Sequence, residues 1–502
     1  MSAALLSGLS QALSLEALLM TLIGVVAGIT VGAIPGLTAT MAVAVLVPFT
    51  FNMDAVLGLA MLLGIYVGGI YGGSISAILL RIPGTPSSIM TARDGYPLTQ
   101  KGEAGRAIGI STFSSFSGGT LGIIALMIAA PLITPISLKF SAPELFMVAL
   151  WGLSCLADVS GKNLVIGLIS AALGILLGTV GMDPLVGAPR LTFGVSELFS
   201  GFEFVPVMIG LLGLPEIFRQ IASMEKTKLD TSIIQKLKRV IPTWADIVRI
   251  KATILRGTLI GLWVGVLPGS TGGNMSSIMA YNYEVKVSKE KEKFGTGHIE
   301  GIAASESANN ACVGGNLIPL LTLGIPGDSV TAILIGAFMI HNIQPGPMLY
   351  RNNPEIVYAI YASLWVAHLF MLIVGLFAAR IFVRAISISK VQLIPMILVL
   401  MIAGAYSVNN NFFDVIVMLV FGVIGYMMEN IDMPVAPMVL GLVLGPIVEV
   451  NLRTALVMSK GDFSIFFTRP ICVAFWVLIA LTLLGPRIAD FLKRKRMQAM
   501  AG

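Results

Sequence analysis

Hydroxyl and amide side chains follow four Pro-Gly pairs that interrupt apolar runs of this chain. A helix that restarts after such a break presents free backbone N–H groups and a partial positive charge of about half a unit. These groups can bind anions without a buried Lys or Arg. The alternative for any single Ser or Thr is a helix N-cap that binds no ligand. The pattern predicts an anion-binding site made by Pro35, Gly36, Thr38, Thr85, Ser87, Ser88, Gly269, Ser270, Thr271, Asn309, Asn310 and Ser329.

Ionisable residues of the second half form another candidate group. Glu306 lies shortly before the apolar run 311–326, and Asp328 follows it directly after a Pro-Gly pair. An ionisable side chain at membrane depth is costly and by default indicates function. We therefore expect Asp328, Glu306 and the amide of Asn310 to hold a coupling cation, either Na+ or H+. The alternative for Glu306 is a helix cap in an aqueous vestibule.

Other chemistry is not expected from this sequence. The three His and three Cys show neither metal-ligand spacing nor a disulfide framework. No G-x-x-x-x-G-K-[ST] motif is present, so the chain is not expected to hydrolyse ATP through a P-loop. We expect no enzymatic activity, no cofactor and no metal other than Na+. An ion gradient is then the expected source of energy.

The composition indicates that lipid is the solvent of most of this chain. Its 502 residues are 56% apolar and only 12% charged, and the mean hydropathy is +0.91. An average soluble protein carries roughly 25% charged residues. The net charge of +6 comes from basic residues in short loops, where they set membrane orientation, and it does not predict nucleic-acid binding. We predict an all-α polytopic membrane protein with about ten to twelve transmembrane helices.

The two halves of the chain carry the same motifs in the same order. Residues 28–38 (GITVGAIPGLT) and 261–271 (GLWVGVLPGST) share six of eleven positions. Residues 72–84 and 314–327 both run from Gly-Gly to Ile-Pro-Gly, with one extra residue in the second copy. Duplicated halves that each contain broken helices are typical of secondary transporters.

Loop charges give the two halves opposite orientations in the membrane. The stretch 219–256 is rich in Lys and Arg and should be cytoplasmic, as should the basic C-terminus, whereas the first fourteen residues have no basic side chain. We therefore predict two inverted-topology repeats that contain broken helices or re-entrant hairpins. The predicted divisions are an N-terminal membrane repeat at 1–218, a cytoplasmic linker at 219–256, a C-terminal membrane repeat at 257–486 and a cytoplasmic tail at 487–502.

The segment 93–98 (RDGYPL) is expected to be a solvated turn within a cytoplasmic loop. A gate that folds over the break at Pro83 is the alternative.

The ordered set of motifs resembles the large membrane subunit of the tripartite tricarboxylate transporter family. The motifs lie in both halves, so the resemblance spans the whole chain. They are GAIPGLT at 32–38, RIPGTPSS at 81–88, DGYPL at 94–98, LPGSTG at 267–272, ASESANNA at 304–311 and GIPGDS at 324–329.

This resemblance implies a secondary active importer of organic carboxylates, such as citrate, other di- and tricarboxylates or aromatic carboxylates, driven by Na+ or H+. It implies a multi-pass protein of the bacterial inner membrane with two partners, a periplasmic solute-binding protein and a small four-helix membrane subunit. It also implies a homodimer with a moving transport domain. The alternative function is an ion or solute channel without coupling.

Overall fold

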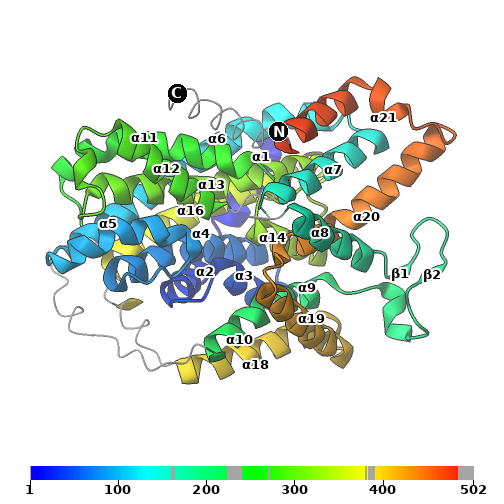
Figure 1. Cartoon of the computed structure of the whole chain (residues 1–502), viewed down its shortest axis with the longest axis horizontal. Helices are drawn as coiled ribbons and strands as arrows, with labels where there is room; N and C mark the ends of the chain where they lie inside the picture. The colour runs from blue at the N-terminus through cyan, green and yellow to red at the C-terminus, as the bar shows by residue number, and fades with distance from the viewer. Residues whose placement is uncertain are drawn as a thin grey trace, which may run out of the picture. The chain divides into compact units, whose positions relative to one another are not determined.

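The computed structural model describes residues 2–159, 164–222, 240–268, 272–378, 381–382 and 390–483. These residues are almost entirely helical (Figure 1), and their strands form one antiparallel pair, β1 (Gly181–Met182) and β2 (Pro189–Arg190). Eight of the described helices are long and apolar enough to cross a membrane, and shorter apolar helices of 10–17 residues accompany them. The prediction of an all-α polytopic membrane protein is confirmed.

The described helices follow one another along the chain in a simple order. The first half contains α1 (Ser2–Ala12), α2 (Leu15–Ala33), α3 (Ala39–Leu46), α4 (Ala55–Leu80), the 3₁₀ turn η2 (Pro86–Ser88), α5 (Ile89–Gln100), α6 (Ala104–Ser137), α7 (Ala142–Val159), α8 (Leu164–Gly178), α9 (Phe204–Met208) and α10 (Leu214–Ala222). The second half contains α11 (Trp244–Val266), α12 (Gly273–Val287), α13 (Ile299–Leu323), α14 (Ser329–Ile340), α15 (Pro347–Asn352), α16 (Pro354–Phe377), α18 (Lys390–Asn409), α19 (Phe412–Asn430), α20 (Val435–Met458) and α21 (Ile465–Thr468).

The chain packs into two compact units. The predicted membrane repeats 1–218 and 257–486 each contribute helices to both units, and the predicted tail 487–502 lies outside the described residues. The first unit comprises Met1–Thr134, Phe204–Leu267 and Thr271–Met427, and the second comprises Pro135–Glu203, Pro268–Ser270 and Met428–Gly502.

In the second unit, α20 packs against α7 and α8. Ion pairs fix the base of the β1–β2 hairpin: Nη1 of Arg453 lies 2.7 Å from Oδ2 of Asp183, and Arg190 pairs with both Asp183 and Glu449. The hydrogen bond from Arg453, supported by backbone N–H groups, lowers the pKa of Asp183 to about 2. Asp183 is therefore ionised throughout the physiological pH range, and the hairpin base stays paired.

Each of the four Pro-Gly pairs connects two helices of the first unit. The first falls between α2 and α3, and the second between α4 and η2. The third falls between α11, which ends at Val266, and α12, which begins at Gly273. The fourth separates α13 from α14. The predicted interruption of a helix at each Pro-Gly pair is therefore confirmed.

Two seams of glycine residues hold the long helices of each half together. In the first half, Gly24, Gly28 and Gly32 place the backbone of α2 directly against α4, and a Cβ on Gly28 would lie 2.4 Å from the carbonyl oxygen of Ile65. The second half repeats this at Gly257, Gly261 and Gly265, where α11 meets α13. The helices α11 and α13 pack against each other, and Figure 1 shows both in the same group of helices as α12. Small residues at every fourth position allow such close approach within membranes.

The seams fix how the two halves correspond. Gly28 approaches the carbonyl of Ile65, and Gly261 approaches that of Ala308, so α4 maps onto α13 with an offset of 308 − 65 = 243 residues. The same offset maps Pro83 onto Pro326, since 326 − 83 = 243. In this correspondence the Gly-Gly pairs at 72–73 and 314–315 are displaced by one residue, which accounts for the extra residue between Gly-Gly and Ile-Pro-Gly in the second copy. The inverted orientation of the two halves stays a prediction.

Candidate functional site

The four restarted helices differ in how their N-termini are capped. Thr38 caps α3 by accepting a hydrogen bond of 3.1 Å from the N–H of Met41. Asp328 caps α14 by accepting one of 2.8 Å from the N–H of Thr331, whose hydroxyl accepts in return from the Asp328 N–H. Thr38 and Asp328 thus satisfy N–H groups that a ligand would otherwise use.

The other two restarted helices have open N-termini. Neither η2, which runs directly into α5, nor α12 receives a side-chain cap from any described residue. The residue before α12 is Gly272, whose positive φ of 49° favours glycine. Among the described residues, two of the four N-termini therefore lack a side-chain cap, as anion binding by their backbone N–H groups would require. The predicted site residues Gly269, Ser270 and Thr271 lie outside the described residues.

The two open N-termini meet in the first unit. The hydroxyl of Ser277 on α12 donates a hydrogen bond of 2.7 Å to the carbonyl oxygen of Ser87. A Cβ on Gly273 would lie 3.1 Å from the Cβ of Ser87 and 2.1 Å from Oδ1 of Asn309. The structure thus brings together residues that are about 190 to 220 positions apart in the sequence, as the prediction of one shared site requires.

Hydroxyl groups line the η2 side of this junction. Thr85 and Ser87 share a hydrogen bond of 2.9 Å between their hydroxyls, and the hydroxyl of Ser88 donates to the carbonyl oxygen of Thr85. All three side chains are buried. They lie at the start of one helix, beside the backbone N–H groups of its first turn.

Unpaired amide groups line the α13 side. Asn309 and Asn310 are fully buried, yet neither amide atom of Asn309, nor Oδ1 of Asn310, has a hydrogen-bond partner among the described residues. Oδ1 of Asn274, in the first turn of α12, is likewise unpaired there. A buried amide without a partner costs roughly 1–3 kcal/mol. Such groups beside two open helix N-termini indicate a ligand site.

The first Pro-Gly break lies next to this junction. Ala39, the first residue of α3, packs against Gly69 of α4, and Gly73 one turn further along α4 contacts Thr85. Thr38 therefore lies close to the η2 side, although its hydroxyl already caps α3. Pro35 and Gly36 precede it, and Gly36 adopts a φ of +91° beside the side chains of α10.

Asp328 is surrounded by hydrogen-bond donors. Its Oδ2 accepts from the hydroxyl of Tyr66 at 2.7 Å and from Nδ2 of Asn316 at 2.9 Å, while Oδ1 accepts from the N–H and hydroxyl of Thr331. A cation at this carboxylate would have to displace some of these donors. Ser329 follows as the first residue of α14. The cation role of Asp328 stays a prediction.

Glu306 is fully buried in the middle of α13 and meets only uncharged donors among the described residues. The hydroxyl of Thr91 on α5 donates to Oε1, and the hydroxyl of Ser115 on α6 donates to Oε2 at 3.0 Å. Nδ2 of Asn310 lies 3.2 Å from the Glu306 carbonyl oxygen, which places Asn310 beside Glu306. The described residues contain no cluster of three or more His, Cys, Asp or Glu that could hold a metal ion.

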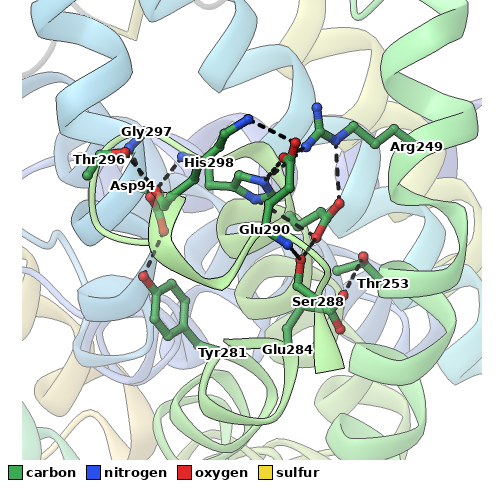
Figure 2. A network of polar contacts seen from close by, with 12 residues as sticks. Asp94, Arg249, Thr253, Tyr281, Glu284, Ser288, Glu290, Thr296, Gly297 and His298 are labelled. Atoms are coloured by element: carbon green, nitrogen blue, oxygen red, sulfur yellow. Dashed lines mark hydrogen bonds and ion pairs between the residues drawn. The ribbon is translucent and has the colours of Figure 1, made fainter. Parts of the chain in front are cut away.

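A second polar centre joins α5 to the segment between α12 and α13 (Figure 2). Oδ1 of Asp94 accepts hydrogen bonds from the N–H groups of Gly295, Gly297 and His298 at 2.8–3.0 Å, and Oδ2 accepts from the hydroxyl of Tyr281. Asp94 is fully buried and lies within α5. The expected solvated turn at 93–98 is therefore wrong. The signal available in the sequence was its DGYPL motif, but its partner loop lies some 200 residues away.

The same loop is bound on its other side by charged residues (Figure 2). Glu290 contacts Arg249, lies 2.8 Å from Nζ of Lys293, and lies 2.9 Å from Nε2 of His298. The hydrogen bonds from Lys293 and His298, with the charge of Arg249, lower the pKa of Glu290 to about 2. Glu290 therefore remains ionised at any physiological pH, and this side of the loop stays paired.

Comparison with known proteins places these features in a family. An uncharacterized 52.8 kDa protein from the TAR-I ttuC' 3' region of Agrobacterium vitis is 39% identical over 470 residues, which cover 93% of this chain and 92% of that protein. An uncharacterized protein from the TAR-II ttuC' 3' region of the same organism is 41% identical over 214 residues, 43% of this chain and 88% of that protein. No solved structure matches the chain. The sequence profile of a transporter family, the tripartite tricarboxylate transporter TctA family, matches residues 18–440, and the chain belongs to that family.

Proposed function

We propose that this protein is a secondary active importer of organic carboxylates. The observation that carries the proposal is the junction of two uncapped helix N-termini, η2–α5 and α12, at the unpaired buried amide of Asn309. Backbone N–H groups, hydroxyls and an amide Nδ2 supply donors for carboxylate oxygens without a fixed positive charge. A site without a buried Lys or Arg also releases its anion more readily, which suits transport.

The substrate is proposed to be a tricarboxylate, a dicarboxylate or an aromatic carboxylate. The family name supports the first of these. The donors come from two helix N-termini and so suit a ligand with more than one anionic group, because each N-terminus carries about half a unit of positive charge. An aromatic carboxylate would bind its single anionic group at one helix N-terminus and would place its ring away from the other.

Import is proposed to be coupled to a cation. Glu306 is the first candidate to carry it, because this carboxylate is fully buried without a cationic partner among the described residues. Asp328 is the second candidate, although its two oxygens already accept from four donors. The ion is proposed to be H+ or Na+.

The chain is proposed to work in the bacterial inner membrane with a periplasmic solute-binding protein and a small four-helix membrane subunit. The word tripartite in the family name supports two partners. A homodimer with a cytoplasmic C-terminus completes the proposal. The competing function is a channel, which would need neither coupling nor saturation.

The experiment that tests this proposal is uptake into proteoliposomes that contain the full-length chain and the products of the neighbouring genes. Labelled citrate, malate and benzoate would be offered separately, with an imposed pH gradient, an imposed Na+ gradient, or neither. We expect saturable uptake of at least one carboxylate and its exchange against the unlabelled compound. Labelled choline, a cation of similar size, is the control and should not enter. Flux that neither saturates nor shows exchange would instead establish a channel.

A further inference from the structure

Three titratable side chains line one face of α6. The face is formed by Thr112, Ser115 and Gly119, whose spacing of three and four residues places them one above another on a helix. Each of these positions contacts a titratable residue of another helix. The contacts are Tyr71 with Thr112, Glu306 with Ser115 and His368 with Gly119.

The first two contacts are hydrogen bonds. The hydroxyls of Tyr71 on α4 and Thr112 lie 2.6 Å apart, and the hydroxyl of Ser115 donates to Glu306. Tyr71 also lies within electrostatic range of Glu306. The described residues supply no Lys, Arg, Asp or second Glu that bonds to Glu306 from α4, α5, α6 or the rest of α13.

The third contact places an imidazole directly against the backbone of α6. A Cβ on Gly119 would lie 1.9 Å from Nε2 of His368, so only glycine leaves room for the ring. Gly375 of the same helix, α16, contacts Tyr71 and Thr112 two turns away. His368 meets Gly119 and Gly375 meets Thr112, so residue numbers rise along α16 as they fall along α6. The two helices are therefore antiparallel here, and the three titratable groups follow one line.

The hydrogen bonds of His368 define which nitrogen can accept a proton. Nδ1 lies 2.9 Å from the carbonyl oxygen of Leu364, which can only accept, so Nδ1 carries the hydrogen of the neutral ring. Nε2 then carries the lone pair. It has no partner among the described residues, and the side chain is fully buried. This basic nitrogen lies at Gly119, one turn of α6 from Ser115, which bonds Glu306, and its free lone pair can receive a proton.

Burial also affects whether the Glu306 carboxyl group carries a negative charge. A carboxylate removed from water without a cationic partner is strongly destabilised and is expected to take up a proton or a cation. The hydroxyls of Thr91 and Ser115 both point their hydrogens at its oxygens, and they would have to turn away to let a Na+ ion bind. A proton can bind a second lone pair of either oxygen while both hydroxyls keep donating, so the present geometry suits a proton better than Na+.

We propose that Glu306 and His368 form a proton path along α6 and that H+ is the coupling ion. The Ser115 hydroxyl first turns from donor to acceptor of the Glu306 carboxyl. The O–H bond of that carboxyl then breaks as its proton moves to Oγ of Ser115, which releases its own hydrogen to one water across the turn of about 5 Å, and the water releases a hydrogen to Nε2 of His368. A new N–H bond forms at Nε2, which leaves a carboxylate and an imidazolium with unchanged total charge. This inference rests on the proposed carboxylate transport and names its coupling ion.

The test uses citrate uptake by the same proteoliposomes, with the membrane potential held at zero by K+ and valinomycin. A gradient of one pH unit supports about tenfold accumulation for each coupled proton. Exchange of labelled for unlabelled citrate at equal pH on both sides needs no net proton movement. The variants are Glu306→Gln, Glu306→Asp and His368→Gln, and His341→Gln, at the C-cap of α14, is the matched histidine control.

We expect Glu306→Gln to lose the tenfold accumulation and to keep exchange, while Glu306→Asp retains both. His368→Gln should keep exchange but lose the dependence of the uptake rate on the imposed pH gradient, and the His341→Gln control should behave as wild type. If Glu306→Gln also loses exchange, the pH profile of His368→Gln decides the question. Normal pH-driven accumulation in both variants, or wild-type uptake driven by Na+ alone, would overturn the proton path. If wild type moves no carboxylate in either assay, the proposed function itself fails.

Discussion

At the scale of single residues, Asn309 occupies the most informative position. Its amide lies between the starts of two helices, buried and unpaired among the described residues. An amide can donate to a carboxylate without holding it as tightly as a charged group would. In the proposed site, Asn309 would therefore bind the anion without neutralising its charge.

Asn309→Asp is predicted to raise the KM for the carboxylate by about tenfold or more, because like charges about 4 Å apart repel by a few kcal/mol. The protein should still fold, since a carboxylate beside a helix N-terminus is stabilised. Uptake kinetics measure the effect. Asn451→Asp, on α20 and outside this junction, is the control and should leave KM unchanged. An unchanged KM in Asn309→Asp would remove this residue from the substrate site.

Asp94 is predicted to be important for stability. Replacing it with Ala leaves three backbone N–H groups of the 295–298 segment without their acceptor, and the expected loss is about 3 kcal/mol or more. Asp94→Asn keeps one acceptor oxygen and should lose less. Thermal unfolding in detergent, followed by tryptophan fluorescence, measures both. Glu292→Ala, at an exposed position of the same loop, should unfold like wild type; an equal loss in that control would refute the role of Asp94.

At the scale of elements, the glycine seams determine which helices pair. Gly28→Ala and Gly261→Ala are each predicted to destabilise the protein by about 1–3 kcal/mol, because the new methyl group meets a backbone carbonyl that cannot move aside. Their equivalent positions should make the two losses similar. Val26→Ala, on the exposed side of α2, is the control. A harmless Gly261→Ala combined with a harmful Gly28→Ala would contradict the equivalence of the seams.

The helix breaks could be predicted from the sequence because Pro and Gly act on the backbone where they stand. Whether a side chain caps each new N-terminus could not be predicted from the sequence. Asp328 and Thr38 cap their helices, whereas Thr85 leaves its hydroxyl to a neighbour, and only the local backbone geometry decides between these outcomes. The burial of Asp94 was missed for a different reason, since its partners come from a loop far along the chain.

At the scale of the whole molecule, the membrane class follows from composition alone, but orientation rests on loop charge. If the two halves are inverted, the residues before α2 and before α11 face opposite sides of the membrane. Ser10→Cys should then react with a membrane-impermeant maleimide in intact cells, and Ile241→Cys only after permeabilisation. Both positions are exposed, and the three native cysteines are buried. Labelling of both from the same side would exclude inverted repeats.

The glycine seams also decide where the molecule can bend. Two helices whose backbones touch at every fourth residue cannot slide along each other, because the first step drives a carbonyl oxygen into the neighbouring chain. We therefore expect α2 with α4, and α11 with α13, to move as rigid pairs. Among the described residues, the non-helical stretches at 34–38, 81–85 and 324–328 are places where the backbone can bend, and they border the proposed ligand site. If the protein transports its substrate as proposed, a movement at these stretches that opens the path to one side of the membrane would also reshape the binding site, so that gate opening and substrate release would occur together.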